Sequence, residues 1–258
     1  MAIETSLDLP VDRRGFLTRA GLVGAGVVGG VMLAGCGGGS SSNASAQSSA
    51  NDTAIISAAI IAETLAVTTY TGIINSTLFT TGLAAHTDDQ AYLTAAQSEE
   101  QIHLNALTAA SGLSIGTTLF YYPTGMFSDP QVTINTLVTL EDAFVAAYLL
   151  GVQQFSTANL RLLAARIMGN ESEHRTLARV IAGDFNLSTT TGLSGSAISV
   201  SPPNNYAYEP TFNLSAISQA VTALKPFFDA TAAAAAGNTV TASYVAVTPN
   251  SALNDINS

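Results

Sequence analysis

Four stretches of the chain carry apolar residues at helical rather than alternating spacing, and each is long enough for several turns. Asp129 and Pro130 precede the third stretch as an N-cap residue followed by proline at the first helical position. Gly112 and Gly183 stand where helix C-termini often carry glycine. The pattern predicts helices over residues 53–79, 87–112, 130–155 and 158–183.

The lengths of the connections predict how these helices are arranged. A few residues around 82–86 join the first two segments, and Ser156 and Thr157 alone separate the last two. Residues 113–128, by contrast, form a long connection between the second and third segments. Short, long, short is the pattern of two helical hairpins joined by one crossover. We therefore expect an all-α, up-down-down-up four-helix bundle over residues 52–184.

The composition shifts to Ser, Thr, Asn and Pro after Asp184, so residues 185–258 form a predicted C-terminal extension. Within it, apolar residues recur at helical spacing at Leu214, Ile217, Val221, Leu224 and Phe228. Pro226 is expected to kink or split this helix. Residues 239–247 alternate weakly, which indicates an extended segment. We expect an accessory helix and loops that pack on the bundle.

The N-terminal 35 residues resemble a twin-arginine signal peptide, with Arg13 and Arg14 before Phe-Leu and an apolar, Gly-rich run over 20–35. The run ends in Leu-Ala-Gly-Cys, similar to a lipobox in which Cys36 is lipidated and becomes the first mature residue. The alternative is an uncleaved membrane anchor, but the run is short for a membrane span.

Residues 36–51 lack charged and large apolar side chains and are predicted to form a flexible tether. The mature protein is therefore expected to be exported and held on the cell envelope by its lipid. The protein is expected to associate with the membrane only through this lipid anchor.

Charge and cysteine content exclude several function classes. Charged residues make up 10% of the 258-residue chain, whereas about 25% is usual for soluble proteins. A net charge of −10 with only eight Lys and Arg residues leaves no basic patch for nucleic acid. The single cysteine excludes internal disulfides, Cys-rich zinc sites and Cys-ligated iron–sulfur clusters.

The predicted helices contain carboxylates at positions within otherwise apolar stretches, where burying a charge is costly. Glu63 is the only charged residue between residues 53 and 86, and Glu141 and Asp142 are the only two in the third helix. The second and fourth helices each carry Glu-x-x-His, which places a carboxylate and an imidazole on one helix face. The set is Glu63, Glu100, His103, Glu141, Glu171 and His174.

This order of ligands is that of di-iron and di-manganese carboxylate bundles. Four carboxylates balance two divalent cations, and two imidazoles complete the coordination while positions stay open for oxygen or peroxide. The ligand types suit iron and manganese equally. Two iron ions are predicted, and manganese is the alternative. If a helix were rotated, Glu99 or Glu173 would replace Glu100 or Glu171. A decayed site, in which the Glu and His side chains satisfy one another, is the other alternative.

Tyr70 and Tyr148 follow Glu63 and Glu141 by seven residues each, and so lie on the same helix faces. Each phenol is predicted to hydrogen-bond the ligand shell, the alternative being a core aromatic with a satisfied hydroxyl. Asp142 is expected to point away from the metals.

At these residues the chain resembles the ferritin-like superfamily, and more closely its exported bacterial branch grouped with desiccation-related proteins. The resemblance covers roughly residues 52–184 and implies the four-helix fold and a dinuclear site. By analogy, Glu100 and Glu171 would bridge the metals, and Glu63 and Glu141 would be terminal ligands. His103 and His174 would bind one metal each.

Three functions are consistent with this pattern. The first is a di-iron oxidoreductase that oxidises Fe(II) with oxygen or peroxide, or removes peroxide, in stress protection. The second is a manganese catalase, and the third is a non-catalytic metal-binding or desiccation-protective envelope protein. The sequence leaves enzyme activity and association into homo-oligomers open.

Overall fold

The computed structural model describes residues 41–79, 87–185, 187, 190–191, 196–197 and 214–253. The chain divides into two units, residues 1–40 and 41–258, and every described residue belongs to the second. The predicted signal peptide, Cys36 and the start of the predicted tether lie outside the described residues.

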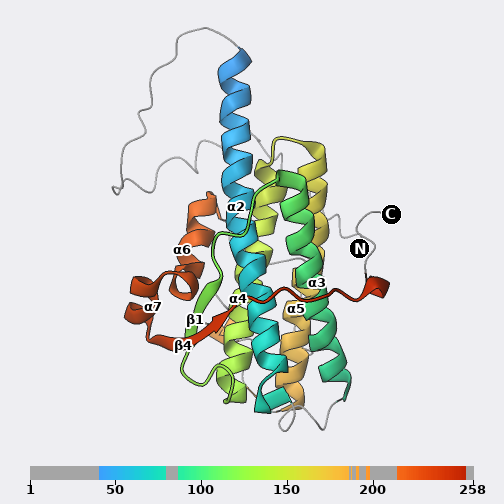
Figure 1. Cartoon of the computed structure of the whole chain (residues 1–258), viewed down its shortest axis with the longest axis vertical. Helices are drawn as coiled ribbons and strands as arrows, with labels where there is room; N and C mark the ends of the chain where they lie inside the picture. Colours follow the sequence, from blue (N-terminus) through green and yellow to red (C-terminus); the bar gives the residue numbers. More distant parts are fainter. Residues whose placement is uncertain are drawn as a thin grey trace, which may run out of the picture. The chain divides into compact units, whose positions relative to one another are not determined.

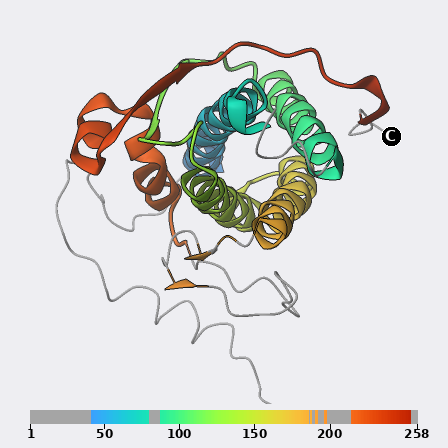
Figure 2. The ribbon, with the colours of Figure 1, turned by 90° about the horizontal axis from the view of Figure 1, so that it is seen from below.

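Four long helices form the bundle as two hairpins side by side (Figure 1). They are α2 (Ser41–Ile74), α3 (Thr87–Ser111), α4 (Pro130–Gln154) and α5 (Ala158–Asp184). Seen along the bundle, α2 and α5 each pack on both α3 and α4 (Figure 2). The crossover runs back along the bundle from the end of α3 to the start of α4, so these two helices point the same way. The all-α fold with one long crossover is confirmed.

Local caps set most of the predicted helix ends. The Asp129 carboxylate accepts hydrogen bonds from two backbone N–H groups in the first turn of α4, at 2.9 and 3.3 Å. Thr157 accepts one in the first turn of α5, at 3.2 Å. Gly112 has a φ of 70° after α3, a conformation that glycine adopts without strain. Gly183, however, is not a C-terminal cap, because α5 continues through it to Asp184.

Helix α2 begins at Ser41 rather than near residue 53, so the flexible tether predicted for residues 36–51 is wrong from Ser41 onward. Extending an existing helix costs far less than forming its first turn, and this segment contains several alanines. The Asp52 carboxylate accepts hydrogen bonds from the backbone N–H of Ser156, at 2.9 Å, and from its hydroxyl. At Asp52, α2 is therefore tied to the turn between α4 and α5.

The crossover contains a strand that the sequence analysis assigned to a loop. Strand β1 (Leu119–Pro123) pairs antiparallel with β4 (Asn238–Ser243), within the tail segment predicted to be extended. A second antiparallel pair joins β2 (Thr190–Thr191) to β3 (Ser196–Ala197). Strand β1 has only five residues and pairs with a strand from the distant C-terminal extension, so the local sequence does not indicate it.

The C-terminal extension supplies the accessory helix that was expected, as α6 (Ile217–Phe228) and α7 (Ala230–Ala236). Pro226 lies inside α6, and the helix breaks at Asp229, just after it. The Asp229 backbone N–H donates to the Lys225 carbonyl at 3.0 Å, and its carboxylate accepts from the Ala232 N–H at 2.8 Å. Asp229 therefore ends one helix and begins the next.

After β4 the chain continues along the outside of α3 toward a short 3₁₀ helix, η2 (Ser251–Leu253). The buried side-chain oxygen of Gln101 accepts hydrogen bonds from the Tyr244 hydroxyl, at 3.0 Å, and from the Val247 N–H, at 3.1 Å. The Asn250 N–H donates to the Ser98 hydroxyl at 2.5 Å. These bonds fasten residues 244–250 to α3.

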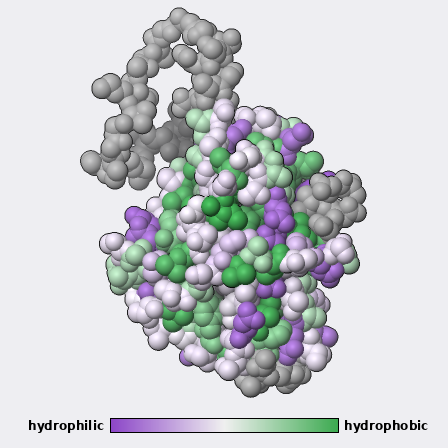
Figure 3. All heavy atoms as spheres, viewed as in Figure 1, coloured by the Kyte–Doolittle hydropathy of each residue, from purple (hydrophilic) through white to green (hydrophobic). Residues whose placement is uncertain are grey.

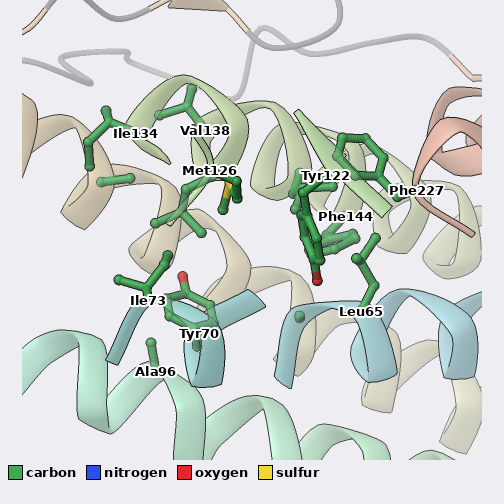
Figure 4. Packing of buried hydrophobic residues seen from close by; sticks show 14 of the residues in the cluster. Leu65, Tyr70, Ile73, Ala96, Tyr122, Met126, Ile134, Val138, Phe144 and Phe227 are labelled. Carbon is green, nitrogen blue, oxygen red and sulfur yellow. The ribbon is translucent and has the colours of Figure 1, made fainter. Parts of the chain in front are cut away.

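The crossover and the extension both contribute to the hydrophobic core (Figure 4). Tyr122 and Met126 of the crossover are fully buried, and Phe227 of α6 packs near them beside Phe144 of α4. The Tyr122 hydroxyl lies 3.1 Å from the Thr69 hydroxyl on α2, so its polar end is satisfied. The core is thus shared between the bundle and the segments outside it.

Two helices in the described part of the chain are long and apolar enough to cross a membrane, at residues 49–74 and 130–154. Within the bundle, 67% and 72% of their most apolar windows are buried, as is usual for core helices of a soluble fold. On the face shown in Figure 3, hydrophobic residues lie in separate patches between weakly polar ones.

Replacing Gly72 of α2 by alanine should destabilise the fold. The added Cβ would lie 2.4 Å from the ring of Phe127 in the crossover, and overpacking of this kind costs about 1–3 kcal/mol. Gly169→Ala in α5 is the matched control, because its Cβ meets nothing within 4 Å and should add about 0.5–1 kcal/mol of stability. Urea unfolding of the metal-free variants measures both, and equal effects would contradict the close packing of the crossover.

Candidate metal centre

Six side chains from all four helices of the bundle converge in its interior. Glu63 comes from α2, Glu100 and His103 from α3, Glu141 from α4, and Glu171 and His174 from α5. All six are 0–3% exposed, so they are removed from solvent. Ionisable groups are rarely buried to this extent unless they are paired or bind a metal. The structure thus brings together the set that the sequence pattern singled out.

The ligand atoms fall into two groups of four, and within each group they lie within 4.8 Å of one another. The first group is Glu63, Glu100, His103 and Glu171, and the second is Glu100, Glu141, Glu171 and His174. The two groups share Glu100 and Glu171. Each group adds one further carboxylate and one imidazole to the two shared carboxylates, so each offers a set of side chains that could hold a metal ion.

Most polar atoms that face this centre lack a hydrogen-bond partner within the protein. Both carboxylate oxygens of Glu100 and of Glu171, one oxygen each of Glu63 and Glu141, and the Nδ1 atoms of both histidines are buried and unbonded. A buried polar atom without a partner costs roughly 1–3 kcal/mol. These eight buried atoms lie close together, and a bound cation would give them the partner that the protein does not.

The histidines present Nδ1 to the centre. His103 Nδ1 lies 3.3–3.5 Å from oxygens of Glu63, Glu100 and Glu171. His174 Nδ1 lies 2.9 Å from Glu100 and 3.4 Å from Glu171, without hydrogen-bond geometry. Each imidazole therefore points at both shared carboxylates, as ligands of adjacent cations would.

Tyr70 and Tyr148 form hydrogen bonds between the two hairpins. The Tyr70 hydroxyl on α2 donates to Glu141 on α4 at 2.7 Å, and the Tyr148 hydroxyl on α4 donates to Glu63 on α2. Spacing along the sequence predicts that each tyrosine lies on the face of the glutamate of its own helix, but each hydroxyl bonds the glutamate of the other hairpin. A reciprocal pair of this kind holds the two unshared carboxylates and joins α2 to α4.

Glu99 makes the two halves of the centre unequal. Its carboxylate lies 2.8 Å from Nε2 of His174, and its side chain is 24% exposed. The corresponding residue before Glu171 is Asn170, which has no carboxylate. A carboxylate on the far nitrogen fixes the tautomer and orientation of a ligand histidine. Glu173, the other register alternative, is exposed and belongs to neither group.

Asp142 points away from the centre, as expected, and forms a buried ion pair that the sequence analysis missed. Its Oδ1 lies 3.2 Å from Arg175 and 3.5 Å from Arg179. Asp142 follows Glu141 and Arg175 follows His174, so the pair fixes the register of α4 and α5 beside two site residues. The scarcity of basic residues was the signal that could have revealed it.

Burial and crowding set the protonation of the carboxylates. Burial, followed by the charges of Glu171 and Glu100, raises the pKa of Glu63 well above its ordinary value. Burial and the same two charges raise the pKa of Glu141. Burial also acts to raise the pKa of Glu100, but His174 and His103 outweigh it and lower that pKa.

The imidazoles and phenols respond to the same charges. Burial acts to lower the pKa of His103 and of His174, but the surrounding carboxylates outweigh it and raise both pKa values. Burial and the adjoining glutamate raise the pKa of Tyr70 and of Tyr148, so both phenols stay protonated as donors. In the metal-free cluster, the raised pKa values therefore favour the protonated forms of Glu63, Glu141, His103 and His174.

A family model described as a ferritin-like domain matches residues 51–184, just over half of the chain. No curated protein and no solved structure matches. The matched range contains all six converging side chains and both tyrosines, and it ends where α5 ends.

A divalent cation that binds this cluster should release protons. Glu63, Glu141, His103 and His174 have raised pKa values, and a cation binds only their deprotonated forms. Apparent affinity should therefore increase as pH rises. Calorimetric titration with Co²⁺ at one pH, in two buffers of different ionisation enthalpy, counts the protons, and net proton uptake would contradict this picture.

Proposed function

This chain belongs to the ferritin-like domain family, and we propose that its buried cluster holds two metal ions and oxidises Fe(II) with oxygen or peroxide. Iron is the proposed metal. The observation that carries the proposal is the pair of four-residue groups that share Glu100 and Glu171. Two separate cation sites would need no shared carboxylates, and the carboxylate oxygens of Glu100 and Glu171 make no hydrogen bond of good geometry within the protein.

Charge balance supports two divalent cations. Four ionised carboxylates from Glu63, Glu100, Glu141 and Glu171 carry four negative charges, which two divalent cations neutralise while the histidines stay neutral. Neutralisation matters at this depth, because an unpaired charge in a low-dielectric interior costs several kcal/mol. Protons on these groups serve the same purpose in the metal-free protein.

The chemistry of such a centre is electron transfer. Two bound Fe(II) ions would supply one electron each, so that dioxygen takes two electrons and two protons and leaves as hydrogen peroxide. With peroxide as oxidant, the same two electrons and two protons give two waters. Cys36 is the only cysteine, so the chain has no Cys-ligated electron-transfer centre of its own, and the electrons come from Fe(II) or an external donor.

The protein's own groups position the site. The Tyr70 and Tyr148 hydroxyls fix the unshared carboxylates, and the Asp142–Arg175 pair fixes α4 against α5 beside Glu141. Burial of the ligands keeps bulk water away from the reacting ions. These groups are positioning residues, since each acts on a ligand carboxylate or on the helices that carry the ligands.

Oxidation of Fe(II) tests the activity directly. Metal-free protein loaded anaerobically with two Fe(II) per chain should consume about one O₂ per two Fe(II) when oxygen is admitted, faster than free Fe(II) does. Oxygen consumption and ferric absorbance measure this. Oxygen evolution from peroxide by the manganese-loaded protein would favour a catalase, and the absence of bound metal would favour a non-catalytic protective role.

Ligand substitutions should separate the two cation positions. Glu141→Ala removes a ligand from one group only and should leave about one tightly bound Co²⁺ per chain, because the other group keeps all four ligands. Glu100→Ala removes a ligand from both groups and should weaken both positions. Equilibrium dialysis with elemental analysis measures the stoichiometry, and circular dichroism checks that helix content is unchanged.

Glu173→Ala is the matched control for these variants, because it removes an exposed glutamate from α5 near Glu171. It should retain two cations per chain. If Glu141→Ala and Glu173→Ala bind the same amount of metal, the dinuclear assignment is wrong.

We further propose that the protein is exported by the twin-arginine route and lipid-anchored through Cys36. The paired arginines and the Leu-Ala-Gly-Cys sequence support this proposal. The twin-arginine route carries folded proteins, so metal could be loaded in the cytoplasm before export. Stress protection on the cell envelope is the proposed role.

Cys36→Ala should release the protein from membranes. Intact mass of the detergent-extracted wild-type protein should correspond to a lipid-modified chain that begins at Cys36, and the variant should lose that modification. A wild-type product that retains Met1, or that stays soluble without detergent, would contradict the anchor.

A further inference from the structure

Helices α2, α4 and α6 enclose an apolar cavity of about 20 Å³ beside the metal centre. Its lining side chains are all aliphatic or aromatic, and many are small, including Ala59, Ala62 and Ala220. The space matches roughly one small molecule, since about 10–15 Å³ holds a single water. Alanines from all three helices line this place, so short side chains leave the space between the packed helices unfilled.

The inner wall of the cavity touches the centre. Tyr148 lines the cavity, and its hydroxyl donates a hydrogen bond to Glu63. Ala62 also lines the cavity and immediately precedes Glu63 in α2. One side chain, Tyr148, thus contacts both the cavity and a candidate ligand carboxylate.

The outer wall lies near the surface. Ala58, Val221 and Phe228 line the cavity and are half-buried, whereas Ala59 and Tyr148 on its inner side are buried. The cavity therefore extends from near solvent toward Glu63. Val221 and Phe228 belong to α6, so this wall is supplied by the C-terminal extension, beyond the residues that match the family.

The chemistry of the lining selects the occupant. The Tyr148 hydroxyl is the only polar side-chain group among the lining residues, and it is engaged with Glu63. A water, an ion or hydrogen peroxide would lose hydrogen bonds on entering such a space, which costs several kcal/mol. A small apolar molecule such as dioxygen loses none.

A charged side chain approaches the centre on the opposite side of the bundle. Glu99 on α3 is 24% exposed and contacts His174, whereas α6 lies beside α2 and α4 (Figure 2). Ions and polar solutes therefore meet a charged group on one side, and apolar molecules meet the cavity on the other.

We propose that the α2–α4–α6 cavity binds dioxygen and delivers it to the metal centre by an apolar route that hydrogen peroxide does not enter. This inference rests on the proposed function and adds to it the route by which dioxygen reaches the centre. It also gives the C-terminal extension a role, because α6 closes the cavity.

Xenon, an apolar probe of similar size, tests the binding site without turnover. Metal-free protein under xenon pressure should bind xenon in the cavity, as seen by ¹²⁹Xe NMR or by diffraction from pressurised crystals. Ala220→Val and the larger Ala220→Leu project from α6 into the cavity and should abolish this binding. Absence of xenon from the wild-type cavity would overturn the inference.

A second apolar cavity of about 20 Å³ provides the matched control. It is lined by residues such as Leu78, Ile134 and Leu187, and no residue of the metal centre lines it. Leu78→Phe fills this second cavity and should leave xenon binding at Ala220 unchanged. Circular dichroism verifies that every variant is folded.

Reaction kinetics then test delivery. In the Fe(II)-loaded protein, Ala220→Leu should slow the reaction with dioxygen by about tenfold, which corresponds to about 1.4 kcal/mol in the barrier. Its metal stoichiometry and its reaction with hydrogen peroxide should not change, and Leu78→Phe should react with dioxygen at the wild-type rate.

Equal dioxygen rates in wild type and Ala220→Leu would overturn the route, although the proposed function would stand. A wild-type protein that binds two Fe(II) but does not react with dioxygen would overturn both.

Discussion

The burial of four carboxylates inside an apolar bundle is the constraint on which the rest of the structure depends. Glu63, Glu100, Glu141 and Glu171 are each at most 2% exposed, and their mutual repulsion would open the bundle unless positive charge lay among them. In the metal-free protein, the raised pKa values of two carboxyls and two imidazoles supply protons for this purpose. Two divalent cations would do the same with better geometry, because eight unbonded buried atoms already face one another.

The surrounding structure keeps this cluster in place through contacts between hairpins. Tyr70 and Tyr148 each bond the glutamate of the other hairpin, so α2 and α4 cannot slide without breaking both bonds. The Asp142–Arg175 pair does the same for α4 and α5. The C-terminal extension pairs with the crossover through β4 and packs α6 against α2 and α4.

The centre is nearly two-fold symmetric in its ligands and asymmetric in its environment. Both halves offer an unshared glutamate, a tyrosine and Glu-x-x-His, yet among the described residues only His174 has a carboxylate, that of Glu99, on its far nitrogen. The faces of the bundle differ as well, since one is polar near Glu99 and the other is closed by α6 over an apolar cavity. The two helical hairpins thus form a cluster with a partly exposed carboxylate on one side and an apolar cavity on the other.

The sequence by itself determined the four helices, the single long crossover and the six residues that converge. Helical periodicity and local caps such as Asp129 depend on neighbouring residues, and a lone Glu63 in an apolar helix is visible without a structure. Strand β1, the partners of Tyr70 and Tyr148, the Asp142–Arg175 pair and the cavity against α6 were decided only by the tertiary structure. Each of these depends on which residues from distant segments meet. Spacing along one helix gives the face of a side chain, but the packing of the helices decides what that face contacts.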